Sequence, residues 1–226
     1  MQTSTAAVFS CLLMVSAAYS QDAKELALGK AVAQQIENKG PRISDPAVQS
    51  YLNHLVNQIA PHAQLSYPVE IRAIRDDEPG AYGLPGGLVL ITSGLLAKTP
   101  SEAALAAIIG HEIGHIATPA LVDSPGATIP LVFIGCSRFI ARPAVRVLAP
   151  VRAAEREAEA DRLGYSYAVA AGFDPDTVRA ALGYAGDGSM PQPAVAYVVN
   201  TSRFEAIRAR FQEPEQARRT PPSLYR

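Results

Sequence analysis

Cysteine is nearly absent from this sequence, which has only Cys11 and Cys136. Since we expect the segment that contains Cys11 to be removed, a disulfide within the mature chain is excluded. An excess of charge of either sign is also absent. The formal net charge is −1, so nothing in the composition points to nucleic acid or to an anionic membrane surface as a partner. Internal repeats are absent as well, and the length fits one globular domain.

A long uninterrupted apolar run is also missing from the middle of the chain. The apolar stretch 129–134 is followed by Arg138, Arg142 and Arg146, so a span of about twenty apolar residues does not form there. For residues 117–151 we expect a buried or amphipathic helix. A peripheral contact with a membrane surface is the alternative for this region.

The N-terminal segment has the composition of a signal peptide. Residues 6–19 are almost all apolar or small, too short for a comfortable membrane span but suited to a signal-peptide core. Small residues at the −3 and −1 positions predict cleavage before Gln21 and a periplasmic or secreted protein. Because a basic residue is missing before this core, a retained anchor is an alternative, as is a lipoprotein. We therefore predict a signal peptide (1–20), one folded domain (21–211) and a flexible tail (212–226).

The most informative stretch is His111-Glu112-Ile113-Gly114-His115, within an apolar, alanine-rich run that predicts a helix. Thr99 as N-cap, Pro100 at the first helical position and Glu102 after them predict where this helix begins. Residues four apart share a helix face, so the two histidines can direct their imidazoles at one metal ion. Glu112 is turned by about 100° from His111, which lets it reach a water near the metal without being a ligand.

Chance occurrence in an unrelated helical protein is the alternative, and it predicts no stoichiometric zinc. Two observations favour a metal. The helix is otherwise almost wholly apolar, and two imidazoles and a carboxylate are costly on a buried helix unless something pairs with them. The chain also has only four histidines, and two of them are in this stretch.

A second acidic stretch, 152–161, predicts the start of another helix. Glu157 and Asp161 are four residues apart and share a face. Glu157 could complete a site of two imidazoles and one carboxylate, and Asp161 could accept the outer N–H of a ligand histidine. The alternative is a solvated face of alternating charges, which is what we expect for Glu155 and Glu159.

These motifs together resemble peptidase family M48, especially its periplasmic branch, over most of residues 22–211. The resemblance includes the HExxH stretch, the PGAYGLPGG stretch at 79–87, the LVLITSGLL stretch at 88–96, and Glu157-x-x-Ala160-Asp161. Two stretches differ from the family pattern. Gly80-Ala81-Tyr82 stands where the family usually has Asn-Ala-Phe, and Tyr197 stands where the family has a late histidine.

The resemblance implies a zincin-like (gluzincin) fold with one zinc ion per chain. The zinc ligands would be His111, His115 and Glu157, with Glu112 as the general base and Asp161 behind a ligand histidine. Arg203 and Tyr197 are the candidate donors to the oxyanion. An extended substrate is expected along an edge strand next to the metal helix, at Gly83, Leu84, Pro85, Gly86, Gly87 and Leu88.

The rest of the pattern predicts an α+β fold, mainly helical, with a small sheet beside the metal helix. Helices are predicted over 22–39, after an Asp45-Pro46 cap, from 152 to 171, after an Asp174-Pro175 cap, and over 201–211. Strands are predicted over 67–74 and 88–92.

The predicted function is that of a zinc endopeptidase acting on extended, unfolded or misfolded proteins outside the cytoplasm, in envelope protein quality control. The alternative is a zinc-stabilised chaperone or assembly factor with little turnover.

Overall fold

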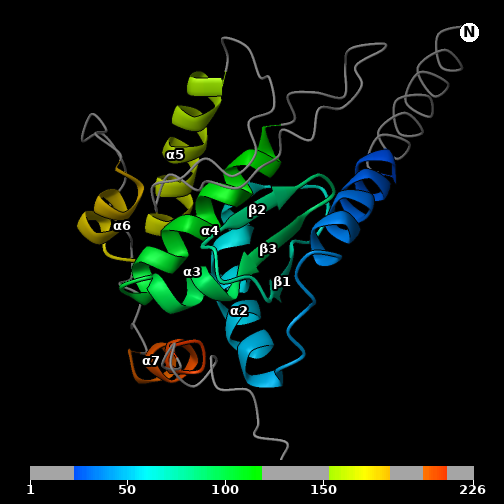
Figure 1. Cartoon of the computed structure of the whole chain (residues 1–226). Helices are drawn as coiled ribbons and strands as arrows, with labels where there is room; N and C mark the ends of the chain where they lie inside the picture. The colour runs from blue at the N-terminus through cyan, green and yellow to red at the C-terminus, as the bar shows by residue number, and fades with distance from the viewer. Residues whose placement is uncertain (1–22, 119–152, 184–200, 213–226) are drawn as a thin grey trace, which may run out of the picture.

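The computed structural model describes residues 23–118, 153–183 and 201–212 (Figure 1). The predicted signal peptide, the stretch 119–151 and the tail beyond residue 212 lie outside the described residues. Among the described helices, none has both the length and the hydropathy that a membrane span requires. The elements in chain order are a helix over 23–37, α2 (Pro46–Ile59), the 3-10 helix η1 (Ala60–Ala63), β1 (Glu70–Ile74), β2 (Ala81–Leu84), β3 (Leu88–Thr92), α3 (Ser93–Lys98), α4 (Glu102–Ala117), α5 (Ala153–Ala170), α6 (Pro175–Leu182) and α7 (Thr201–Ala209).

This arrangement confirms the predicted α+β class, mainly helical with a small sheet. The sheet has the strand order β1-β3-β2. β3 runs parallel to β1, with Glu70 opposite Leu88, and antiparallel to β2, with Leu84 opposite Leu88. The prediction that the 88–92 strand forms the edge is therefore wrong, because β3 is paired on both sides. All five residues of β3 are buried, as expected for a continuous apolar run in a central strand.

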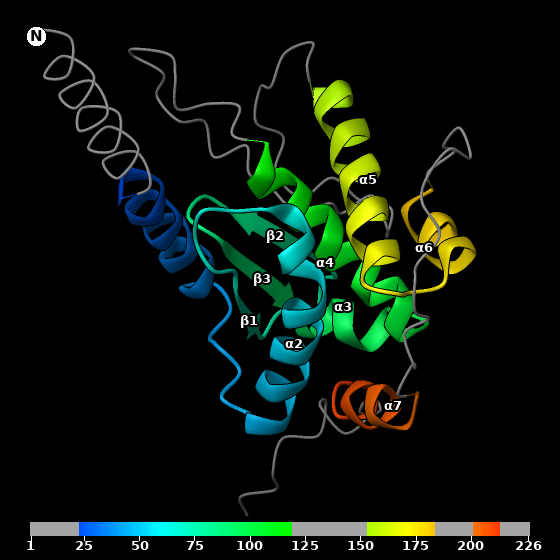
Figure 2. The ribbon, with the colours of Figure 1, turned by 180° about the vertical axis from the view of Figure 1, so that it is seen from behind.

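The two faces of the sheet are covered by different helices. Val32 and Ala33, from the helix over 23–37, pack with Leu84, Leu88 and Leu90 on one face. The main hydrophobic core lies on the other face, where α2 packs against β1 and α4 against β2. α2 is accordingly behind the sheet in Figure 1 and in front of it in Figure 2.

The two edges of the sheet differ. Along β1, Ile43 N–H donates to Ala73 C=O at 2.8 Å and Arg75 N–H donates to Pro41 C=O at 2.9 Å. This edge is therefore covered by the chain's own segment 41–43. The other edge strand is β2, and one face of this strand packs on α4.

Helix α4 is buried over almost its whole length: only His115 and Ala117 among its residues are not fully buried. Its start differs from the prediction. The N-cap is Ser101, whose hydroxyl accepts from Ala104 N–H. Thr99 instead ends α3, and its hydroxyl donates to Leu95 C=O at 2.7 Å. The preceding helix thus occupies the hydroxyl that the sequence pattern assigned to α4.

The main chains of α4 and α5 are in contact where the two helices cross, because glycines lie at the crossing. A Cβ added to Gly110 would come within 2.8 Å of Gly164 C=O, and one added to Gly114 within 3.0 Å of Ala160 C=O. The crossing places residues 157–161 of α5 over residues 111–115 of α4.

Candidate metal centre

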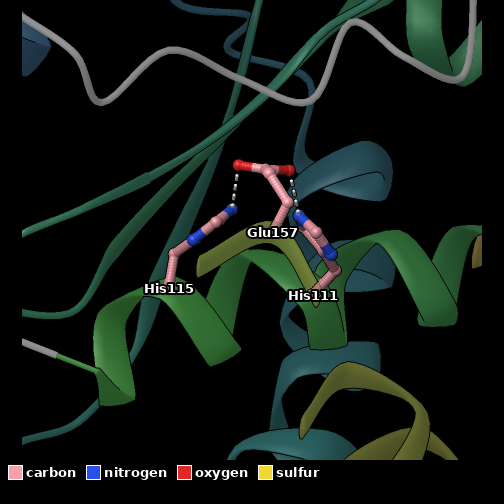
Figure 3. Close-up of side chains that lie close together, drawn as sticks. All are labelled: His111, His115 and Glu157. Carbon is pink, nitrogen blue, oxygen red and sulfur yellow. Dashed lines mark ion pairs between the residues drawn. The ribbon is translucent and has the colours of Figure 1, made fainter. Parts of the chain in front are cut away.

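Three potential metal ligands converge at the crossing of α4 and α5. Nε2 of His111 lies 3.6 Å from Oε2 of Glu157, and Nε2 of His115 lies 3.4 Å from Oε1 of Glu157. One ligand atom from each of the three residues lies within 4.8 Å of the others. Figure 3 shows both imidazoles rising from α4 toward the carboxylate that α5 places above them.

These separations suit a small tetrahedral ion. Two ligand atoms bound to zinc at 2.0–2.2 Å in tetrahedral geometry lie about 3.3–3.6 Å apart. The two N···O distances, 3.4 and 3.6 Å, match that spacing. Two imidazoles and one carboxylate are also the ligand set of catalytic zinc sites that keep a fourth position open. The residues present therefore fit a zinc ion.

His111 is held by a partner on its other nitrogen. Nδ1 of His111 lies 2.9 Å from Oδ1 of Asp161, and both side chains are buried. Because a carboxylate can only accept, Nδ1 carries the proton of this hydrogen bond, and Nε2 is left facing Glu157. The predicted contact of Asp161 with a ligand histidine is thus present in the structure.

His115 is kept in the form that a metal requires. Burial, and then the neighbouring His111, lower the pKa of His115 from 6.5 to about 4. The two rings meet edge to face, with centroids 4.6 Å apart. His115 is therefore neutral at pH 7, with a lone pair available to a metal.

Glu112 lies outside the group of three ligands. It is 1% exposed, and its Oε2 accepts a hydrogen bond of 2.7 Å from the main-chain N–H of Gly83 on β2. Glu112 comes from the same helix turn as His111 but faces the edge strand. The arrangement supplies a carboxylate beside the cluster that is available for proton transfer.

Comparison with known proteins agrees with this geometry. Residues 46–125, which include β2 and the histidines of α4, match the model of Peptidase family M48. Over these residues the chain is similar to that family. The beta-barrel assembly-enhancing protease of Escherichia coli is 28% identical over 175 residues, covering 69% of this chain and 36% of that protein.

Two shorter similarities are to other proteases. The Protease HtpX homolog of Bordetella petrii is 36% identical over 87 residues, covering 34% of this chain and 29% of that protein. The mitochondrial metalloendopeptidase OMA1 of Schizosaccharomyces pombe is 44% identical over 46 residues, 20% of this chain and 14% of that protein. The chain spans about a third of the length of the assembly-enhancing proteases it matches.

The residues predicted to bind substrate fall into three groups in the structure. Gly83 and Leu84 lie on the edge strand β2. Leu88 lies on the central strand and is flanked by β1 and β2, so its backbone is not at the edge and the prediction for it is wrong.

The turn over residues 85–87 packs beneath the helix over 23–37. Gly29 is in direct contact with Pro85 C=O, and a Cβ added to Gly86 would come within 2.5 Å of Leu26 Cα. Both Gly86 and Gly87 have positive φ, 75° and 85°, which suits the turn. The structure thus gives this turn a packing partner within the chain, and a role in substrate binding stays a prediction.

Only one of the two candidate oxyanion donors lies in the part of the chain that the structure describes. Tyr197 lies outside the described residues. Arg203, on α7, donates from Nη2 to Ser50 Oγ at 3.2 Å, and its guanidinium lies 5.5 Å from the ring centroid of Tyr51. Both partners belong to α2, so the described contacts of Arg203 hold α7 against α2. Its part in catalysis stays a prediction.

Sequence reasoning did not find the positions that bring α4 and α5 together. Gly110, Gly114 and Gly164 are isolated glycines inside helical patterns, where each costs about 1 kcal/mol relative to alanine. Such a glycine indicates close packing, and this signal was present in the sequence. The hydrogen bond from Gly83 to Glu112 had no comparable signal, because it depends on how β2 lies on α4.

Proposed function

We propose that this chain is a zinc-dependent endopeptidase. The observation that supports it best is the convergence of His111, His115 and Glu157, with Asp161 behind one ligand and Glu112 beside the cluster. A structural zinc site would close all four positions with protein ligands, whereas this set leaves one position open. The arrangement is therefore suited to hydrolysis.

The chemistry that zinc supplies when bound is that of a Lewis acid, which makes a water more acidic and a peptide carbonyl more polar. Glu112 takes the proton of that water and later gives it to the leaving amine, so one side chain serves as base and then as acid. Asp161 holds a proton on Nδ1 of His111, which leaves Nε2 for the metal, and burial lowers the pKa of His115.

The substrate we propose is an extended or unfolded polypeptide. In the β2–β3 ladder, Thr92 N–H donates to Gly80 C=O at 3.0 Å, and the register continues this pattern at Tyr82 and Leu84. In an antiparallel pair the intervening residues direct their N–H and C=O groups away from the partner strand. The main-chain groups of Ala81 and Gly83 therefore face outward. Gly83 N–H donates to Glu112, and a peptide can add as a further strand at the other outward groups.

We further propose that the protein acts outside the cytoplasm on misfolded envelope proteins. The apolar segment 6–19 and the small residues before Gln21 support export. The name of the Escherichia coli relative, a beta-barrel assembly-enhancing protease, supports a role in quality control. Intact-mass analysis of the protein from a periplasmic fraction should show a chain that begins near Gln21, and a full-length chain in the cytosol would contradict export.

Metal content and cleavage of casein by the purified protein test the enzymatic proposal. The wild-type chain should contain about one zinc per chain and cleave casein, and a chelator should abolish cleavage. Glu112→Gln keeps the shape of the side chain but removes its basic carboxylate, so zinc should stay while turnover falls about 10²–10⁴-fold. Wild-type protein with zinc but without turnover would contradict the endopeptidase function.

The second candidate is a zinc-stabilised chaperone or assembly factor, favoured by the words "assembly-enhancing" in the name of the relatives. It predicts that the zinc-loaded wild-type protein suppresses aggregation of an unfolded protein without cleaving it. Glu112→Gln should then be as effective as wild type. Loss of this effect in Glu112→Gln would favour the peptidase.

A further inference from the structure

Gly83 contacts Glu112 in two ways. Its main-chain N–H donates to Glu112 Oε2 at 2.7 Å, within the range of short charge-assisted hydrogen bonds. A Cβ added to Gly83 would overlap the main-chain carbonyl oxygen of Glu112 and lie 3.2 Å from Oε2. The same residue thus lies against both the backbone and the carboxylate of Glu112.

The direction of this N–H is fixed by the sheet. Gly83 is opposite Val89, between the hydrogen-bonded pairs at Tyr82 and Leu84. Its N–H is therefore directed away from β3 by the pairing of its neighbours. β3 is buried along its whole length. Because β2 is paired with this buried strand, a donor on β2 holds its acceptor more firmly than a donor on a loop.

We propose that Gly83 is a positioning residue for the general base. Its N–H holds one oxygen of Glu112 and so sets the orientation of the carboxylate beside the ligand cluster. This inference rests on the proposed peptidase function and changes the role predicted for Gly83, which was substrate binding. The N–H of Gly83 is engaged with Glu112, so an added substrate strand pairs with Ala81 N–H, Ala81 C=O and Gly83 C=O instead.

The two outward-facing residues of β2 therefore have separable roles. Ala81 supplies the outward N–H that binds substrate, and Gly83 supplies the one that orients the base. Loss of the Ala81 N–H affects KM. Loss of the Gly83 N–H affects kcat, because the orientation of the carboxylate matters chiefly when the proton is transferred.

Replacing a single amide by an ester tests this division. Gly83→glycolic acid, introduced by nonsense suppression, removes the N–H and adds no Cβ. It should lower kcat for an extended peptide about 10-fold or more, with KM within about 2-fold and zinc content unchanged.

Ala81→lactic acid is the matched variant. Each ester also weakens one carbonyl acceptor in the β2–β3 ladder, that of Tyr82 or of Gly80, so the loss within the ladder is similar in the two variants. The Ala81 ester should raise KM and leave kcat within about 2-fold. If the Gly83 ester raised KM and left kcat unchanged, Gly83 would be a substrate-binding residue and the inference would be wrong.

A measurement without turnover separates this inference from the proposed function. In the metal-free protein, hydrogen–deuterium exchange followed by NMR should show Gly83 N–H protected, although it faces away from β3. In Glu112→Ala its exchange should be about 10-fold faster or more, and Glu112→Gln, which keeps an oxygen acceptor, should restore part of the protection. Equal exchange rates in wild type and Glu112→Ala would overturn the inference. Absence of zinc-dependent cleavage by the wild-type protein would overturn the proposed function alone.

Discussion

Gly164 of α5 lies directly against the main chain of His111 on α4: a Cβ added to Gly164 would come within 2.5 Å of His111 N and 2.7 Å of His111 Cα. This contact sets the distance between the helix with the two histidines and the helix with Glu157 and Asp161. Both atoms of His111 belong to the backbone of a buried helix, so they cannot rotate away as a flexible side chain would.

Gly164→Ala should weaken both folding and metal binding. Alanine gains about 1 kcal/mol in helix propensity, but overpacking against a backbone typically costs about 1–3 kcal/mol. Because the clash separates α5 from α4, it also moves Glu157 and Asp161 away from the histidines. Denaturant unfolding of the metal-free protein and a zinc titration measure the two effects.

Gly183→Ala is the matched control for this change. A Cβ there would meet nothing within 4 Å, so its cost comes from the φ of +64° alone. The control should keep its zinc affinity. A Gly164→Ala variant with unchanged zinc affinity and stability would show that the crossing tolerates a wider spacing.

Asp161→Ala should loosen zinc without removing it. The hydrogen bond to His111 Nδ1 fixes the ring and its tautomer, and loss of such a partner typically costs 10–100-fold in metal affinity. Glu159→Ala, on the same helix, removes an exposed carboxylate that pairs with Arg162 and should leave affinity within about 2-fold. Competition with a chromophoric chelator measures both constants, and equal affinities for the two variants would contradict the role of Asp161.

Proline at two positions distinguishes the edge strand from the central strand. Leu88→Pro removes a donor from β3, which is paired on both sides, and should unfold the protein or lower its melting temperature sharply. Ala81→Pro removes an outward N–H on the edge strand, where proline is tolerated. This variant should stay folded, keep zinc and show KM raised about 5-fold or more. Unchanged KM for Ala81→Pro would place the substrate elsewhere.

Removal of the metal should lower the melting temperature, because the three ligands are brought together only in the folded state. Zinc present at about 100 times its dissociation constant stabilises the folded state by about 2.7 kcal/mol, so a chelator should lower the melting temperature of the wild-type protein. Glu157→Ala should lose zinc and show a melting temperature that no longer responds to the chelator. If this variant kept both metal and cleavage, Glu157 would not be a ligand.

The sequence by itself determined the parts of this protein that depend on local chemistry. The 3.6-residue period of a helix puts His111 and His115 on one face whatever lies around them. The Asp45-Pro46 signal is local in the same sense, and Asp45 Oδ1 does accept from Ala47 N–H and Val48 N–H. The i, i+4 spacing of Glu157 and Asp161 likewise predicted that one helix would present both carboxylates to the histidines.

Tertiary structure decided which local signal applied where two were available. Thr99 and Ser101 are both good caps, and the end of α3 at Leu95 takes the hydroxyl of Thr99, which leaves Ser101 to begin α4. Likewise, residues 81–84 and 88–92 are both short and apolar. Their order in the sheet depends on the pairing of β3 with β1, which lies earlier in the sequence. No local pattern in the sequence indicates that pairing.

The contact between Glu112 and β2 was also decided by tertiary structure. Glu112 and Gly83 are 29 positions apart, and nothing in their neighbourhoods specifies the contact. It exists because the face of β2 that bears Ala81 and Gly83 packs on α4, with Gly83 directly against the main chain of Glu112, while the opposite face packs on the helix over 23–37. Periodicity identifies the residues on each face of an element, but only the packing of the elements determines which faces meet.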